Sequence, residues 1–116
     1  YNLPCKRVIH TVGPVYESER RKAEDRPERL LRRCYRRSLE LAVENKMKTI
    51  AFPGISTGVY GYPSVDAAHA VLDEVHDFLE SHDIGMLERI IFCCFSPKDE
   101  ETYEGVIPYV KSQTYR

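Results

Sequence analysis

The chain has 116 residues, of which 42% are hydrophobic and 30% are charged, and its formal net charge is -1. This length and composition predict one small globular domain with a hydrophobic core. The near-neutral charge gives no argument for non-specific binding to nucleic acid or to a membrane surface. The sequence contains no apolar run of roughly 18 residues and no signal-peptide pattern, so we expect an intracellular protein of the cytoplasm or nucleus.

The first predicted element is a strand over residues 5–12, which are rich in β-branched side chains and are followed by a Gly-Pro pair. His10 alternates with two valines along that strand. This pattern favours a core histidine that is hydrogen-bonded to the backbone over a catalytic base.

Residues 17–28 alternate in charge, which is typical of a solvated loop. A helix is predicted from Pro27, which suits a first turn, to about Asn45, because apolar residues recur on one face. The other side of this helix carries four arginines: Arg32, Arg33, Arg36 and Arg37. A basic face of this kind could bind phosphate backbones, but five nearby acidic residues favour an ordinary solvated surface.

Residues 50–52 form a short apolar run that predicts a buried strand. Three glycines and two hydroxyl residues follow it: Gly54, Gly58, Gly61, Ser56 and Thr57. Pro63 then opens an amphipathic helix over residues 64–82, and Gly85 terminates it. A strand, a glycine-rich turn and a helix N-terminus together provide an anion site built from backbone N–H groups. No Lys or Arg lies in residues 49–63, so a phosphate there would depend on amides and the helix dipole.

A second apolar run over residues 90–95 predicts a strand that is covered on both faces. Residues 96–99 combine an N-cap serine, a first-turn proline and a carboxylate, so another helix starts there. Gly105 and Pro108 weaken that helix, which we expect to be short or broken. The alternation of strands and helices predicts an α/β fold with a largely parallel sheet and helices on both faces. Ligands of such sheets bind beyond the carboxyl ends of the strands, where residues 13–14, 54–61 and 95–96 would meet.

The cysteines and histidines do not indicate a metal site. The four cysteines, Cys5, Cys34, Cys93 and Cys94, lack metal-type spacing. We expect them to be reduced and mostly buried. His69 and His76 lie seven residues apart on one predicted helix, and two such residues without a third ligand are more often surface or partner-facing histidines.

The segment Gly54-Ile-Ser-Thr-Gly58 also matches the G-x-S-x-G pattern of serine hydrolases, in the expected strand-to-helix context. A nucleophilic Ser56 would need a base. Each histidine after Ser56 lies on the next helix, and none follows Asp99. The chain is also too short for that fold, so the serine hydrolase is the weaker alternative.

Two aromatic residues lie at the predicted ligand edge. Tyr60 is in the middle of the glycine-rich loop, where a core role is hard to arrange, and it suits stacking on a sugar or base. Phe95 ends the second apolar run, where it either packs in the core or faces a ligand.

Four segments resemble the macrodomain family and, within it, the MacroD-type mono-ADP-ribosylhydrolases: residues 1–4, 8–14, 51–63 and 92–99. The resemblance implies a three-layer α/β/α fold with a mixed, mostly parallel sheet that binds ADP-ribose at the strand ends. It implies that the diphosphate is wrapped by Ser56, Thr57, Gly58, Val59, Tyr60 and Gly61. Tyr60 would lie over the distal ribose and Phe95 would face the adenine, with Tyr60 and Gly58 supporting catalysis. We expect no cofactor and no metal.

Other signatures of the family come before the stretch that resembles residues 1–4. They are an Asn-Ala-Ala-Asn segment, a first phosphate loop carrying an acidic residue, and an early Asp that reads the adenine. The family also places an early strand between those matching residues 8–12 and 50–52. We therefore expect residues 1–116 to be a single partial macrodomain that lacks its N-terminal strands. Its open edges would pair with the missing N-terminal half or with a second copy.

Two functions agree with these residues. In the first, the complete domain hydrolyses ADP-ribose from mono-ADP-ribosylated proteins or acts on O-acetyl-ADP-ribose. This piece alone would then be weak or inactive, because no carboxylate is placed to serve as the acid. In the second, the chain is a non-catalytic ADP-ribose reader or an inactive fragment. The expected partners are ADP-ribose or an ADP-ribosylated protein, and neither nucleic acid nor a membrane.

Overall fold

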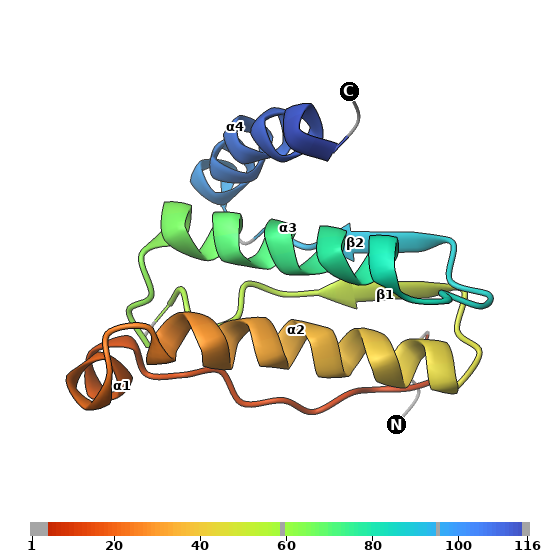
Figure 1. The fold of residues 1–116 in the computed structure, drawn as a ribbon, viewed down its shortest axis with the longest axis horizontal. Helices are drawn as coiled ribbons and strands as arrows, with labels where there is room; N and C mark the ends of the chain where they lie inside the picture. The colour runs from red at the N-terminus through yellow and green to blue at the C-terminus, as the bar shows by residue number, and fades with distance from the viewer. Residues whose placement is uncertain (1–4, 59, 95, 115–116) are drawn as a thin grey trace.

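The computed structural model describes residues 5–58, 60–94 and 96–114 of the chain. The described elements are, in order, α1 (Tyr16–Lys22), α2 (Arg26–Glu44), β1 (Thr49–Phe52), α3 (Ser64–Ser81), β2 (Arg89–Phe92) and α4 (Pro97–Thr114) (Figure 1). The two strands pair in parallel, with Thr49 opposite Arg89 and Phe52 opposite Phe92. Because α3 is the crossover between them, this part of the chain is the β-α-β unit of an α/β fold, as predicted.

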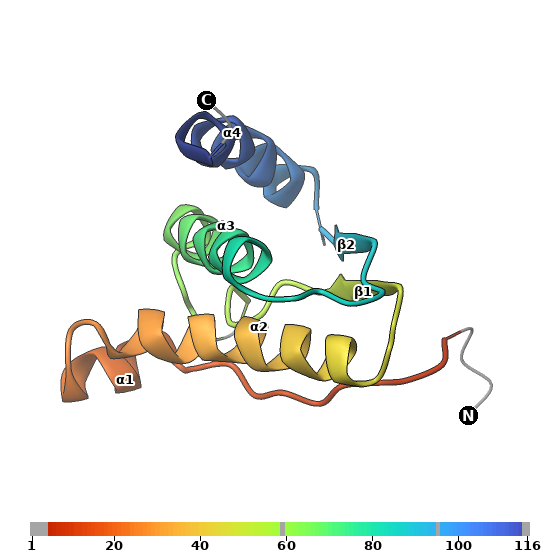
Figure 2. The same ribbon diagram turned by 45° about the vertical axis from the view of Figure 1, so that its right-hand side comes forward.

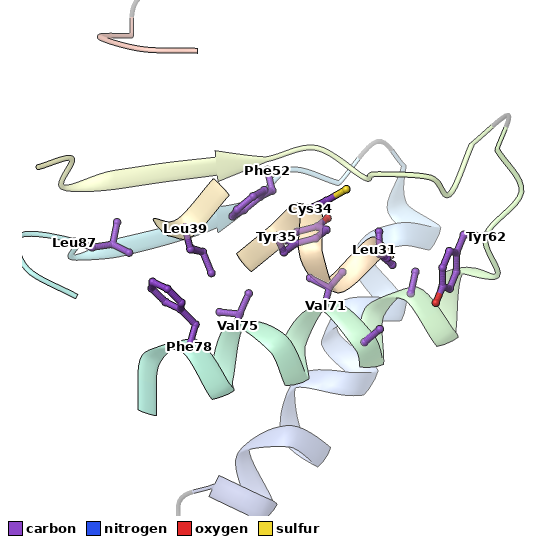
Figure 3. Packing of buried hydrophobic residues seen from close by; sticks show 12 residues of the cluster. Leu31, Cys34, Tyr35, Leu39, Phe52, Tyr62, Val71, Val75, Phe78 and Leu87 are labelled. Carbon is purple, nitrogen blue, oxygen red and sulfur yellow. The ribbon is translucent and has the colours of Figure 1, made fainter. Parts of the chain in front are cut away.

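The hydrophobic core lies between α2, α3 and one face of the sheet. Figure 2 shows α3 lying between α2 and α4. Figure 3 shows side chains from α2, α3 and β1 that point toward one another: Leu31, Tyr35, Leu39, Val71, Val75, Phe78 and Phe52. The rings of Tyr35 and Phe52 are 4.6 Å apart between centroids. Each large side chain buried in this way contributes roughly 1.5–3 kcal/mol, so this core holds the strand ends in place.

Ion pairs within α2 and from α2 to α3 engage three of the four arginines on this face, namely Arg32, Arg36 and Arg37. Glu74 on α3 is buried and accepts from Arg36 Nε at 2.6 Å and from Arg32 Nη1 at 3.4 Å. Arg37 contacts Glu40 and Glu44 on its own helix, both at 3.2 Å. These pairings agree with the prediction of an ordinary solvated surface rather than a site for phosphate backbones.

The predicted strand over residues 5–12 is absent. The described residues 5–15 run as an irregular segment beside α2 (Figure 1). A hydrogen bond from Cys34 Sγ to the Val12 carbonyl oxygen, 3.4 Å long, joins this segment to the helix. A strand exists only beside a partner, and among the described residues β1 pairs with β2 alone. His10 is exposed, so the prediction of a core histidine was wrong.

The segment predicted as a charged loop contains α1. The alternating charges correctly indicate solvation, because no residue of α1 is buried. They also form the pairs that a helix brings together. Glu19 accepts from Lys22 at 3.0 Å and from Arg26 at 2.9 Å. These hydrogen bonds lower the pKa of the Glu19 carboxyl, with the bond from Arg26 as the largest cause.

Helix α4 is longer than predicted, since it continues through Gly105 and Pro108. Its start agrees with the predicted capping box, because Ser96 Oγ accepts from the Asp99 amide at 3.3 Å. Tertiary packing offsets the weak residues. Val106 is buried against Ala68 and Leu72 of α3, with Tyr103 and Ile107 beside them.

The strand β2 is covered on one face only. Ile90 and Phe92 are half-buried toward the helices, whereas Ile91 is 41% exposed on the other face. Ala51 is exposed next to it on β1. The prediction of a strand covered on both faces was therefore wrong for this part of the chain.

The cysteines also differ from the prediction. All four are free thiols, but Cys34 is the buried one, and Cys5, Cys93 and Cys94 are exposed. Cys93 and Cys94 follow directly after the end of β2 at Phe92. Within the described residues, no helix is both long enough and apolar enough to cross a membrane.

Candidate ligand site at the strand ends

The loop of residues 53–62 connects the end of β1 to α3 and is closed by its own hydrogen bonds. Ser56 and Gly61 adopt left-handed backbone angles, with φ of 67° and 75°. The Gly61 amide donates to the Gly58 carbonyl at 3.0 Å, and the Tyr62 amide donates to the Ser56 carbonyl at 2.8 Å. The loop is therefore a defined turn that its own main-chain hydrogen bonds close.

Some backbone amides of this turn donate hydrogen bonds within the loop, and others remain free to bind a ligand. The Gly61 amide is used inside the loop, whereas those of Thr57, Gly58 and Tyr60 donate to no other described group. Backbone N–H groups that lack an internal partner are what an anion site requires. This separates a structural role for Gly61 from a donor role for the other three.

Gly58 and Gly61 differ in why a glycine is present. A Cβ built on either one meets nothing within 4 Å. Gly61 needs glycine for its positive φ, which L side chains rarely adopt. Gly58 has no such backbone angle and is exposed, so the chain itself would accept a side chain there. The open space above Gly58 is where another molecule can approach the backbone closely.

Ser56 is buried without a base. It is 8% exposed, and its Oγ has no hydrogen-bond partner among the described residues. A serine nucleophile requires a hydrogen-bonded general base. The geometry therefore gives no support to the serine-hydrolase alternative.

The carboxyl ends of β1 and β2 meet the start of α4 at a small cavity. Its lining includes Pro53, Gly54 and Thr57 from the loop, Cys93 and Cys94 after β2, and Asp99, Thr102 and Tyr103 from α4. Asp99 contributes a carboxylate to this lining. The sequence predicted only a capping role for that carboxylate. Burial raises the pKa of the Tyr103 hydroxyl and of the Tyr35 hydroxyl. The Tyr35 hydroxyl donates a hydrogen bond to the Pro53 carbonyl oxygen at 3.3 Å. Partial burial and the nearby Asp99 raise the pKa of the Cys94 thiol, which disfavours a thiolate nucleophile.

The loop is also tied to the segment before α2. The Tyr16 amide donates to the Tyr60 carbonyl at 3.0 Å, and the rings of Tyr16 and Tyr62 meet edge to face at 5.0 Å. Burial, as the largest cause, raises the pKa of Tyr62 to about 12. Sequence reasoning missed both tyrosines, because a hydrogen bond between distant segments leaves no local pattern.

The structure brings most of the predicted site residues into this one loop. They are Ser56, which is buried; Thr57, which is half-buried; and Gly58, Tyr60 and Gly61, which are exposed. Tyr60 is 41% exposed, so its ring does not serve the core. The predicted residues Val59 and Phe95 lie outside the described residues. Gly13 lies against Ser56 and Ile55, so the first two of the three segments expected at the crevice lie together. The cavity places Gly54 and Thr57 beside Cys93, Cys94 and Asp99, on either side of the third expected segment. Within the described ranges, no three His, Cys, Asp or Glu side chains gather as a metal site would require.

A family model described as "Macro domain" matches residues 1–71, which is more than half of the chain. The chain therefore belongs to the macrodomain family. It is 42% identical over 109 residues to the ADP-ribose glycohydrolase MACROD1 of Rattus norvegicus, covering 94% of this chain and 41% of that protein. It is 42% identical over 106 residues to the O-acetyl-ADP-ribose deacetylase of Escherichia fergusonii, covering 91% of this chain and 56% of that protein.

A solved structure gives the same fold. A variant of the Oceanobacillus iheyensis macrodomain, solved with ADPR, superposes with a TM-score of 0.82 at 38% identity, covering 97% of this chain and 56% of that chain. The predicted α/β macrodomain class is thus confirmed. The chain spans about half the length of these relatives.

Proposed function

We propose that this chain is the diphosphate-binding part of a macrodomain whose complete form removes ADP-ribose from mono-ADP-ribosylated proteins or acts on O-acetyl-ADP-ribose. The observation that carries the proposal is Gly58, a glycine that its own backbone does not require, facing open space beside free amides. The absence of Lys and Arg from residues 49–63 supports a site in which amides hold the anion. The relatives named above include an ADP-ribose glycohydrolase and an O-acetyl-ADP-ribose deacetylase.

In this proposal the amides of residues 56–60 hold the diphosphate, and Gly61 shapes the turn that presents them. These donors are already oriented by the turn, so they would stabilise charge without reorganising. The exposed ring of Tyr60 lies over the distal ribose, where it helps to exclude water. Val59 completes the phosphate loop and Phe95 faces the adenine. Tyr60 and Gly58 support catalysis by fixing the ligand so that a bound water attacks the ribose C1″.

We propose that residues 1–116 act as one part of a single domain inside the cell. The open sheet face with Ala51 and Ile91 supports this arrangement, because an exposed sheet edge and face favour pairing. The rest of the domain, or a second copy of this chain, would cover that face. A non-catalytic reader of ADP-ribose is the second candidate. The half-length match favours it for this chain alone, because residues outside it would supply the acid.

Titration of the 116-residue chain with ADP-ribose, followed by thermal unfolding, tests binding. A ligand at about 100 times its dissociation constant stabilises the folded state by about 2.7 kcal/mol. ADP alone should give a smaller shift, and ribose none. The absence of a shift at millimolar ADP-ribose contradicts the proposal for this chain. Release of ADP-ribose from a mono-ADP-ribosylated protein then separates enzyme from reader, and we expect little or no turnover by this chain alone.

A further inference from the structure

The segment of residues 13–16 touches the back of the loop of residues 53–62 at two points, although some 40 positions separate them in the sequence. At the first point, a Cβ built on Gly13 would collide with Ser56 Oγ and Ile55 Cγ2. At the second, the Tyr16 amide donates to the Tyr60 carbonyl at 3.0 Å. The proposed function gives neither contact a role.

Glycine is needed at position 13 because a side chain would not fit there, and not because of its backbone angle. Its φ lies outside the left-handed region, so any residue could adopt its backbone. Only the side chain is excluded, because Ser56 and Ile55 occupy the space that a Cβ would fill. The close approach of the Gly13 backbone to these two side chains is therefore what glycine permits at this position.

Ser56 has two costs that its surroundings must offset. It is a non-glycine residue with a φ of 67°, and its buried Oγ has no hydrogen-bond partner among the described residues. Such a conformation persists only where neighbouring structure holds it. Gly13 lies against Ser56, and the Ser56 carbonyl in turn accepts from the Tyr62 amide at 2.8 Å. A displacement of Ser56 would therefore reach Tyr62 and the free amides between them.

We propose that the Gly13–Tyr16 segment is a brace that sets the conformation of the phosphate loop, with Gly13 as its positioning residue. Gly13 keeps Ser56 in its left-handed angle, and the Tyr16 amide fixes the Tyr60 carbonyl. Together they aim the amides of Thr57, Gly58 and Tyr60 before a ligand arrives. The part of this inference that names ADP-ribose rests on the proposed function. The brace itself does not.

The direct test is Gly13→Ala in the 116-residue chain, with Gly105→Ala as the matched control. A Cβ at Gly105 meets nothing within 4 Å, and that residue lies in α4. Misplacing binding groups by a fraction of an ångström to about 1 Å costs roughly ten- to a hundredfold. We expect Gly13→Ala to raise the ADP-ribose Kd by that factor and Gly105→Ala to leave it unchanged. Equal Kd values for Gly13→Ala and the wild type overturn the brace.

Amide hydrogen exchange tests the brace without ligand. In the wild type, the Tyr16 and Tyr62 amides should be protected, and Gly13→Ala should expose them while the amides in the middle of α2 stay protected. Wild-type amides that exchange freely at Tyr16 and Tyr62 also overturn the brace. If protection is lost as expected but the wild type binds no ADP-ribose, the brace holds and the proposed function fails.

A second pair of variants covers the case in which Gly13→Ala does not fold. Tyr16→Pro removes the N–H that reaches Tyr60, at a first helical position where proline is well tolerated. Tyr16→Ala removes the ring and keeps the N–H. Faster exchange across residues 60–62 in Tyr16→Pro than in Tyr16→Ala supports the brace, and equal exchange contradicts it. In addition, Ser56→Gly should partly restore binding and protection to Gly13→Ala, because it removes the colliding hydroxyl.

Discussion

Two neighbouring regions of this chain, the core between α2 and α3 and the loop of residues 53–62, are held by different interactions. The core consists of large apolar side chains with almost no exposure, such as Leu39 and Phe78. Among the described residues, the loop is held by three main-chain hydrogen bonds, by a serine with a left-handed backbone angle and by the close approach of Gly13. Burial of the core side chains contributes most to the free energy of unfolding, but these side chains do not contact the ligand in the proposed site. The loop contributes little to that free energy, and its conformation orients the free amides. Substitutions in the two regions should therefore separate stability from binding.

The largest expected effect is on the core side of this comparison. Leu39→Ala removes a fully buried side chain and should lower the free energy of unfolding by about 2–5 kcal/mol. Ile91→Ala is the matched control on the open sheet face and should stay within about 0.5 kcal/mol. Urea denaturation measures both. A large loss for Ile91→Ala would show that this face is covered in solution by another chain.

Gly58→Glu should abolish binding and leave the stability of the chain unchanged. A carboxylate at this position would occupy the space above the free amides and repel phosphate, so we expect no thermal shift with ADP-ribose. Its unfolding free energy should stay within about 0.5 kcal/mol of the wild type, because a side chain fits there. Gly61→Ala sharpens the contrast. Because the φ of Gly61 is 75°, this substitution should lower the free energy of unfolding by about 1–2 kcal/mol as well as weaken binding. Retained binding by Gly58→Glu contradicts the proposed site.

The loop and the core also differ in how far the sequence predicts them. Helices α2 and α3 and strand β1 follow from local periodicity, and the predicted ends at Asn45, Phe52 and His82 differ from the observed ones by one residue or none. The strand over residues 5–12 could not be judged locally, because pairing depends on a partner distant in the sequence. The loop was placed correctly from its glycines. The contact of the loop with Gly13, and the hydrogen bond that the Gly61 amide donates within the loop, depend on tertiary structure. Neither can be predicted from the spacing of residues in the sequence.

A smaller effect is expected from pH at the junction of the two regions. Tyr62 is buried and its pKa is raised to about 12 from a model-peptide value near 10. Its neutral form therefore contributes stability that is fully present below pH 10 and is lost as the pH rises toward 12. Tyr62→Phe should therefore remove this part of the alkaline loss. Parallel pH titrations of unfolding for Tyr62→Phe and the wild type would contradict the assignment.

The smallest expected effect is that of Ser56→Ala. If backbone amides hold the diphosphate, removal of the hydroxyl should change the ADP-ribose Kd by less than about threefold, which is under 1 kcal/mol. Stability should be unchanged or slightly higher, because the buried Oγ has no described partner to lose. Alanine keeps the Cβ of position 56, which lies 3.3 Å from a Cβ built on Gly13, and removes only the hydroxyl. Isothermal titration and thermal unfolding measure both quantities. A complete loss of binding in Ser56→Ala would instead show that the hydroxyl itself contacts the ligand, and it would return the serine nucleophile to consideration.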